Sequence, residues 1–117
     1  MELLEGGDLS REPNLSGADL READLPRADL SEADLARADL PRADLSEANL
    51  SGTNLTEADL SGANLAGADL SGVDLAEAIL TGADLSTASL TQQELEPATG
   101  DENTRLPPDL NPLRTGE

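Results

Sequence analysis

Carboxylates are the main side chains of this 117-residue chain that could do chemistry. The chain has 25 Asp and Glu residues against seven basic residues, all of which are Arg, and it contains no His, Cys or Tyr. Without His, Cys or Lys it cannot form a Ser-His-Asp triad, a Cys-His pair or a lysine Schiff base. The enzymatic chemistry left open is acid–base work by a pair of carboxylates, or a Ser or Thr acting alone.

The spacing of these carboxylates argues against catalysis. Asp recurs at five-residue intervals, as in Asp19, Asp24 and Asp29. A row of this regularity predicts a solvated outer wall, whereas an acid–base pair needs a cleft that moves the two pKa values apart. We therefore predict that the protein is not an enzyme and binds no cofactor.

Leucine sets the period of the chain. Leu occupies every fifth position from Leu15 to Leu95, usually with Ala two residues earlier and Asp or Asn between them. A period of five scatters leucines around a helix and alternates them across a straight strand. Ala and Leu can instead share the inner face of a short extended side, and the next two residues can form a corner. The pattern predicts coils with aliphatic interiors, stacked at about 4.8 Å.

The charges on the second residue after each Leu test how many sides one coil has. Coils with four sides stack residues 20 apart, whereas three-sided and five-sided coils bring more like charges together. Four sides give three opposite-sign pairs: Glu22 with Arg42, Arg27 with Glu47, and Arg37 with Glu57. One like-charge pair remains, Glu57 with Glu77. We expect these pairs to indicate the register rather than to supply the stability, because exposed ion pairs contribute about 0.2–1 kcal/mol.

The predicted core follows from the same register. Thr53 and Val73 share one inner column, so the Thr53 hydroxyl should hydrogen-bond to backbone, because an unpaired buried hydroxyl costs about 1–3 kcal/mol. The inward leucines are Leu20, Leu25, Leu30, Leu35, Leu40, Leu45, Leu50, Leu55, Leu60, Leu65, Leu70, Leu75, Leu80 and Leu85.

The repeat, Ala-Asp-Leu-Ser-Gly or Ala-Asn-Leu-Ser-Gly, resembles that of the pentapeptide-repeat family. The resemblance covers sixteen consecutive repeats, about residues 13–92. It implies an all-β, right-handed quadrilateral β-helix of about four 20-residue coils. The segment from Leu90 to Pro108 also resembles the closing segment of many members, although Pro97 stands where that segment favours a helix former.

Each end of an open solenoid needs a cap. Thr91-Gln-Gln-Glu94 reads as a capping box, so a short helix should begin at Gln92 and be limited by Pro97. We predict an N-terminal cap or irregular start over 1–12, the repeat domain over 13–92, and the capping helix with an irregular tail over 93–117. Leu106 and Leu110 should touch the cap. At the start, Leu3 and Leu4 could cover the first coil.

The net charge of −18 limits the partners. Such a surface repels phosphate backbones and anionic lipid, so we expect neither direct nucleic-acid binding nor membrane binding. The N-terminus lacks a basic start and an apolar run, so a cytoplasmic protein is predicted. We expect a monomer or a weak dimer.

The predicted function is a protein-interaction or structural scaffold with an unidentified protein partner. Ile79 stands where Asp or Asn is usual and is a possible partner contact. The resemblance implies an alternative, because certain members of the family are acidic rods that mimic DNA and bind DNA gyrase, protecting it against quinolones.

Two further binding hypotheses rest on the stacked columns. The Asp column of Asp19, Asp39 and Asp59 could attract a cation, but its spacing matches no calcium loop and no metal site is predicted. A hydroxyl ladder, formed by Ser31, Ser51, Ser71 and Thr91, could suggest ice or carbohydrate binding. Small polar residues at corners are more simply turn formers.

Overall fold

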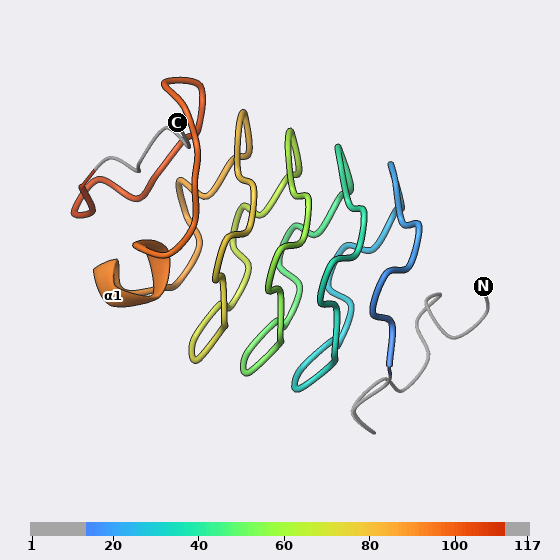
Figure 1. Ribbon diagram of the computed structural model, residues 1–117. Helices are drawn as coiled ribbons and strands as arrows, with labels where there is room; N and C mark the ends of the chain where they lie inside the picture. Colours follow the sequence, from blue (N-terminus) through green and yellow to red (C-terminus); the bar gives the residue numbers. More distant parts are fainter. Residues whose placement is uncertain (1–13, 112–117) are drawn as a thin grey trace.

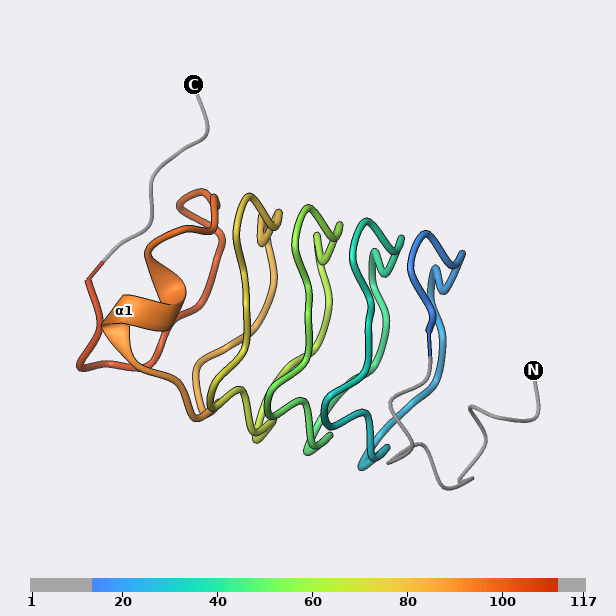
Figure 2. The ribbon, with the colours of Figure 1, turned by 60° about the horizontal axis from the view of Figure 1, so that its bottom comes forward.

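Residues 14–111, which the computed structural model describes, wind into coils stacked along one axis (Figure 1). Parallel bridges join residues 20 apart, such as Asp39 to Asp59 and Asp59 to Ile79. Each of the four sides contributes one such bridge per coil, and the coils lie side by side in both views (Figure 2). The predicted four-sided coil of 20 residues is therefore confirmed.

One repeat shows how the backbone is satisfied. In Ala58–Gly62, the N–H of Ala58 donates to Leu55 O within the chain's own turn (3.0 Å). The N–H of Asp59 donates back to the previous coil and the N–H of Leu60 donates forward to the next, at 3.0 and 2.8 Å. The Ser61 N–H donates to the side chain of Asp59, and that of Gly62 donates to Thr81 O (2.8 Å). All five N–H groups are therefore bonded, which a buried backbone requires.

Each corner has the pattern of a type II turn. The N–H of Ala63 donates to Leu60 O at 3.0 Å, and Gly62, the third residue of this turn, has φ +68°. This turn needs positive φ at its third residue, which glycine adopts without strain. Eight corners place a charged residue there instead: Glu22, Arg27, Glu32, Arg37, Arg42, Glu47, Glu57 and Glu77.

The core is a column of leucines with small residues between them. All fourteen predicted core leucines, from Leu20 to Leu85, are buried, and none is more than 5% exposed. Thr53 is fully buried among them, and its hydroxyl donates to Leu30 O at 2.8 Å. The predicted bond from Thr53 to backbone is therefore confirmed.

Helix α1 (Gln92–Leu95) ends the run of regular coils. Thr91 is its N-cap, and the reciprocal bonds between Thr91 and Glu94 form the capping box that the sequence predicts. Leu95 is fully buried, so the helix covers the exposed end of the leucine column. The predicted start of the helix at Gln92 is confirmed.

The segment after the helix is more regular than the sequence predicts. Thr99 bridges to Ile79 and Arg105 bridges to Asp84, so this segment adds two sides of a fifth coil where an irregular tail is expected. Asp84 and Arg105 are 21 residues apart because the turn over 101–104 has one extra residue. That insertion breaks the period and hides the two sides from a sequence search. Leu106 and Leu110 pack against the core, as expected.

Some expectations fall outside the described residues. The N-terminal cap over 1–12, with Leu3 and Leu4, lies there, as does the end of the tail over 112–117. Over 14–111, the structure has no helix that is long and apolar enough to cross a membrane.

Candidate binding surface

Three residues of every repeat point outward, and the first of them holds the turn. The Oδ1 atom of Asp69 accepts the N–H and the hydroxyl of Ser71, at 3.0 and 2.7 Å. Asn49 accepts the same two bonds from Ser51, at 3.1 and 2.7 Å. Either residue serves because each offers a side-chain oxygen to the backbone two residues on. The recurring Asp is therefore required by the turn as an acceptor and not as a charge.

These bonds also keep the carboxylates ionised. The Ser71 hydroxyl, followed by its N–H, lowers the pKa of Asp69, and Ser46 and Ser86 lower the pKa of Asp44 and Asp84 in the same way. Hydrogen bonds to the charged form favour it. The outer wall therefore stays negatively charged well below neutral pH.

The Asp19 column offers no metal cage. Asp19 forms an ion pair with Arg21, whose Nε and Nη2 donate to the carboxylate at 2.8 and 2.9 Å. The side chain and N–H of Arg21 lower the pKa of Asp19. Within the described part of the chain, no three acidic side chains form a group that could hold a metal ion.

The hydroxyl ladder is occupied by local bonds. The Ser31 and Ser51 hydroxyls each donate to the Asp or Asn two residues earlier, at 2.7 Å. Ser71 does the same, and the Thr91 hydroxyl accepts the Glu94 N–H as the N-cap of α1. These side chains shape turns and a helix start, so they do not form a free row of hydroxyls.

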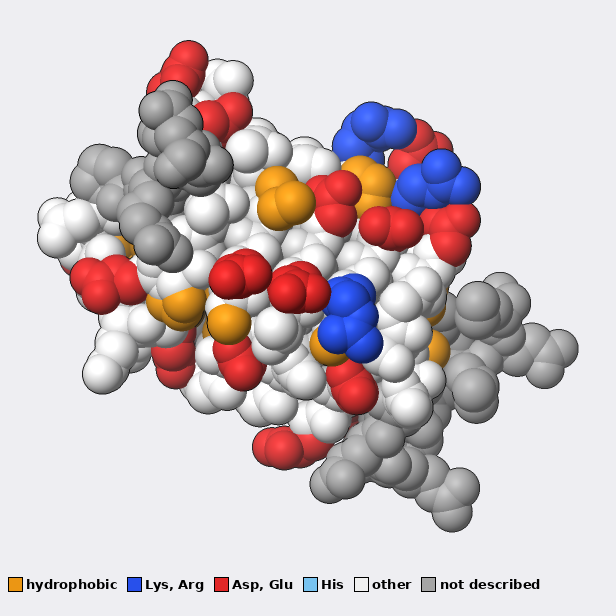
Figure 3. All heavy atoms as spheres, in the orientation of Figure 1, with side chains coloured by type: hydrophobic (Ala, Val, Ile, Leu, Met, Phe, Trp, Pro, Cys, Tyr) orange, Lys and Arg blue, Asp and Glu red, His pale blue; other side chains and the backbone are white. Residues whose placement is uncertain are grey.

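Charge is segregated along the axis of the solenoid. Arg21, Arg27, Arg37 and Arg42 all lie in the first two coils, and no basic residue occurs between residues 43 and 104. Figure 3 shows the blue side chains on the side of the N-terminal coils, and red side chains continue toward the C-terminal end. The first coils are therefore of mixed charge, and the later coils are acidic alone.

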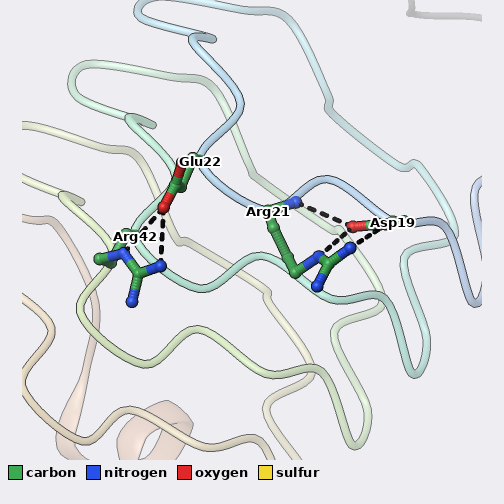
Figure 4. Close-up of polar contacts among 4 residues, drawn as sticks. All are labelled: Asp19, Arg21, Glu22 and Arg42. Atoms are coloured by element: carbon green, nitrogen blue, oxygen red, sulfur yellow. Dashed lines mark hydrogen bonds and ion pairs between the residues drawn. The ribbon is translucent and has the colours of Figure 1, made fainter.

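One of the three predicted ion pairs between coils forms. Arg42 Nη2 lies 2.7 Å from Glu22 Oε2, as Figure 4 shows. The other two predictions, Arg27 with Glu47 and Arg37 with Glu57, are wrong, because neither pair is joined within residues 14–111. Long exposed side chains lose conformational freedom when they pair in water, and this offsets most of the attraction.

A shallow open depression of about 400 Å³ lies over the first two coils. Its lining consists of the two ion pairs drawn in Figure 4, Asp19 with Arg21 and Glu22 with Arg42. All four charges are already paired there. The depression therefore offers no unpaired charge to a ligand.

Corner glycines make room for charged side chains of the preceding coil. A Cβ atom on Gly62 would lie 3.1 Å from Cγ of Arg42, and one on Gly67 would lie 3.0 Å from Cγ of Glu47. On Gly52 it would overlap the Glu32 carboxylate. Sequence reasoning missed this packing, although its signal is visible: in three columns a glycine follows a charged residue 20 positions later.

Ile79, the predicted partner contact, lies on the outside and is 39% exposed. It takes the Asp position of its repeat and bridges to Asp59 and Thr99 on the neighbouring coils. No other large apolar side chain of the described chain is exposed to this extent.

The fold and its surface define a repeat protein, a solenoid whose outward residues are presented in columns. The sequence profile of the family described as pentapeptide repeats (8 copies) matches residues 14–52 and 53–92. The chain belongs to the pentapeptide-repeat family, and its fold is a right-handed quadrilateral β-helix. Members of this family are generally structural repeat proteins.

Solved structures of the family resemble this chain over most of its length. A pentapeptide repeat protein from the thylakoid lumen of Arabidopsis thaliana is 32% identical, with a TM-score of 0.74, covering 86% of this chain and 68% of that one. A second, from Nostoc PCC 7120, is 38% identical, with a TM-score of 0.54 and coverage of 91% and 87%. No curated protein sequence matches the chain.

Proposed function

We propose that this protein is a non-catalytic binding scaffold whose later coils present an acidic wall to a protein partner with a basic surface. The segregation of charge carries the proposal, because residues 43–104 contain carboxylates and no basic residue. A field of one sign steers an oppositely charged partner toward its binding surface. The N-terminal coils, with four arginines, lack this uniform field.

The architecture supports a scaffold rather than an enzyme. The inner residues fill the coil, and the outward carboxylates are held singly at turns such as that of Asp69 and Ser71. No cleft brings two of the described carboxylates into an acid–base pair with separated pKa values. Rigid columns of side chains suit recognition of an extended surface, which is the common use of solenoids.

The turn chemistry allows the charge to be removed without altering the fold. Asn already replaces Asp at Asn49, Asn54 and Asn64 and accepts the same bonds. A variant of the later coils carries four Asp→Asn changes, at Asp59, Asp69, Asp74 and Asp84. A matched control carries four in the first coils, at Asp24, Asp29, Asp34 and Asp39.

Affinity capture from native lysate at graded salt compares these two variants with the parent chain. We expect basic proteins to be retained by the parent chain and by the N-terminal control, to elute with salt, and to be lost by the variant of the later coils. Equal retention by both variants, or capture that salt leaves unchanged, would show that the acidic wall is not the binding surface.

The DNA-mimicry alternative is a special case of this proposal in which the basic partner grips DNA. The acidic wall is the feature that supports it, and cytoplasmic DNA gyrase is the partner to test first. Inhibition of gyrase supercoiling that disappears in the variant of the later coils would support it. Unchanged supercoiling at excess protein would reject it and would leave other basic partners open.

A further inference from the structure

One corner of the solenoid departs from the other three. Its column runs Gly17, Arg37, Glu57, Glu77, so no glycine follows its charged residues, whereas Gly62, Gly67 and Gly52 follow charged residues in the other columns. We call this surface the Arg37 ridge. It consists of Ala36, Arg37, Glu57, Ala76, Glu77 and Ile79.

The first unusual feature of the ridge is an unpaired cation. Arg37 is exposed and forms no ion pair with any residue of 14–111, although Glu57 lies one coil away in its own column. Arg42, on the next corner of the same coil, is paired with Glu22 at 2.7 Å. The Arg37 guanidinium is therefore available to an acceptor from outside.

The second unusual feature is a stack of like charges. Glu57 and Glu77 are both exposed and occupy the same position on successive coils, which lie about 4.8 Å apart. Like charges directly opposite each other on neighbouring strands are destabilising. A cation supplied from outside the chain would relieve this repulsion.

The third unusual feature is apolar. Ile79, at 39% exposure, lies two residues beyond Glu77 on the adjoining side, and Ala76 beside it is half-buried. The Asp that stands at this position on the two preceding coils, Asp39 and Asp59, is replaced here alone. The ridge thus combines a free cation, an unbalanced anion and a small apolar surface.

We propose that the Arg37 ridge binds the same ridge of a second copy of this chain in an antiparallel pair. A two-fold axis at Glu57, perpendicular to the solenoid, exchanges the coils on either side of it. Arg37 and Glu77 each lie one coil from Glu57, so Arg37 of one copy meets Glu77 of the second copy, twice. The Ile79 side chain then packs on Ala36 and the aliphatic stem of the facing arginine.

This arrangement is isologous, as closed dimers require, because the same patch is used on both copies. It also leaves one repulsive contact, since the two Glu57 side chains meet at the axis. The dimer should therefore be weak and should tighten when Glu57 loses its charge. The inference is independent of the acidic wall, because it involves one corner and not the partner of the later coils.

Net charge gives the pair a recognisable dependence on salt. Each copy carries −18, so the copies repel at long range at low ionic strength. Salt screens this repulsion beyond a Debye length of about 8 Å at 0.15 M, whereas ion pairs in contact are screened less. Association should therefore rise as salt is raised from about 0.01 to 0.15 M, whereas two oppositely charged partners would show the reverse.

Sedimentation equilibrium of the full chain over a concentration series tests the proposal. We expect dimer at high concentration for the parent chain, its loss in Arg37→Glu, its recovery in the charge swap Arg37→Glu with Glu77→Arg, and a shift to lower concentration in Glu57→Gln. Arg27→Glu is the matched control and should leave the dimer intact, because Arg27 is also exposed and without an ion pair among residues 14–111 and has φ +61° against +59° for Arg37.

Three outcomes would overturn the proposal. A parent chain that stays monomeric at every concentration and salt would do so, as would equal loss of dimer in Arg27→Glu and Arg37→Glu. Failure of the charge swap to restore association would also do so, provided that a thermal melt shows both single variants and the swap to be folded. Because none of these outcomes depends on a basic partner, they leave the proposed function to its own test.

Discussion

The carboxylate of Glu94 joins the capping helix to the last regular coil. Its Oε2 accepts the Gly72 N–H at 2.7 Å, and its Oε1 accepts the Thr91 N–H at 2.9 Å. In earlier coils the corner N–H donates to a backbone carbonyl of the next coil, as the Gly52 N–H does to Ser71 O. Glu94 supplies the oxygen that the missing coil would have provided.

The same substitution occurs at the other corners of the last coil. The Gly67 N–H donates to the Thr87 hydroxyl at 2.9 Å, and the Gly82 N–H donates to Asp101 Oδ1 at 3.2 Å. Side-chain oxygens therefore replace the carbonyls that a continuing solenoid would present. This closure removes the exposed donors that would otherwise invite another strand.

Glu94→Ala should destabilise the protein by about 1–2 kcal/mol, because hydrogen bonds to charged groups contribute about 1.5–3 kcal/mol each and both donors here are partly solvated. Glu96→Ala is the control, since Glu96 is exposed and its side chain forms no hydrogen bond in the described structure. It should change stability by no more than about 0.5 kcal/mol. Urea unfolding measures both, and equal losses would contradict a capping role for Glu94.

Leu60→Ala should cost about 2–5 kcal/mol, because Leu60 is fully buried and its truncation leaves a cavity that the stacked coils cannot close. The neighbouring outward position offers a control in Asn64→Asp, since Asp at this position keeps the oxygen that accepts the Ala66 N–H. Denaturant unfolding with a common m-value gives the two changes in free energy. A loss below about 0.5 kcal/mol for Leu60→Ala would mean that the leucine column does not carry the stability.

Much of the fold can be predicted from the sequence because the period alone places each residue inside or outside. Leu60 and Thr53 repeat the same environment every 20 residues, so a single register decides their burial and the partner of the Thr53 hydroxyl. Side chains on the surface are different. Arg37 and Glu57 stack as the register requires, yet solvent screening and side-chain entropy leave them unpaired. No period reports that outcome.

The end of the chain was hidden for another reason. Thr104 takes the place of the inward Ala in the fifth coil, and its hydroxyl donates to Leu80 O at 2.8 Å, much as Thr53 donates to Leu30 O. One inserted residue and Gly100, which stands in place of the inward Leu, break the five-residue pattern there. Backbone pairing continues beyond the point where the sequence repeat can be followed.

Glu47→Gly should stabilise the protein by up to about 1 kcal/mol. Glu47 has φ +59°, a conformation that costs an L-residue about 1–2 kcal/mol, whereas the added chain entropy of glycine offsets about 0.5–1 kcal/mol of the gain. Ala66→Gly, at the carbonyl that receives the Glu47 N–H, should instead lose about 0.5–1 kcal/mol, because Ala66 does not have positive φ. Thermal melts of the two variants should shift in opposite directions. A shift of both in the same direction would contradict strain at the corner.

Acid should remove part of the stability through the bonded Asp side chains. The hydroxyls and N–H groups of Ser46 and Ser71 lower the pKa of Asp44 and Asp69 in the folded state. As the pH falls, the unfolded chain takes up these protons first, at its ordinary pKa of about 3.9. The unfolded state then binds more protons, so the free energy of unfolding rises with pH in this window. The contribution is complete above about pH 4 and is lost as the pH falls below it.

Replacing Asp44 and Asp69 by Asn together should flatten this dependence, because Asn accepts the same bonds without titrating. We expect the melting temperature of this double variant to fall less than that of the parent chain between about pH 5 and pH 3. The control, Asp24→Asn with Asp39→Asn, removes the same charge at repeats where Pro26 and Pro41 supply no N–H for the side chain to accept. If the two double variants show the same slope against pH, general charge repulsion and not the turn hydrogen bond governs the acid response.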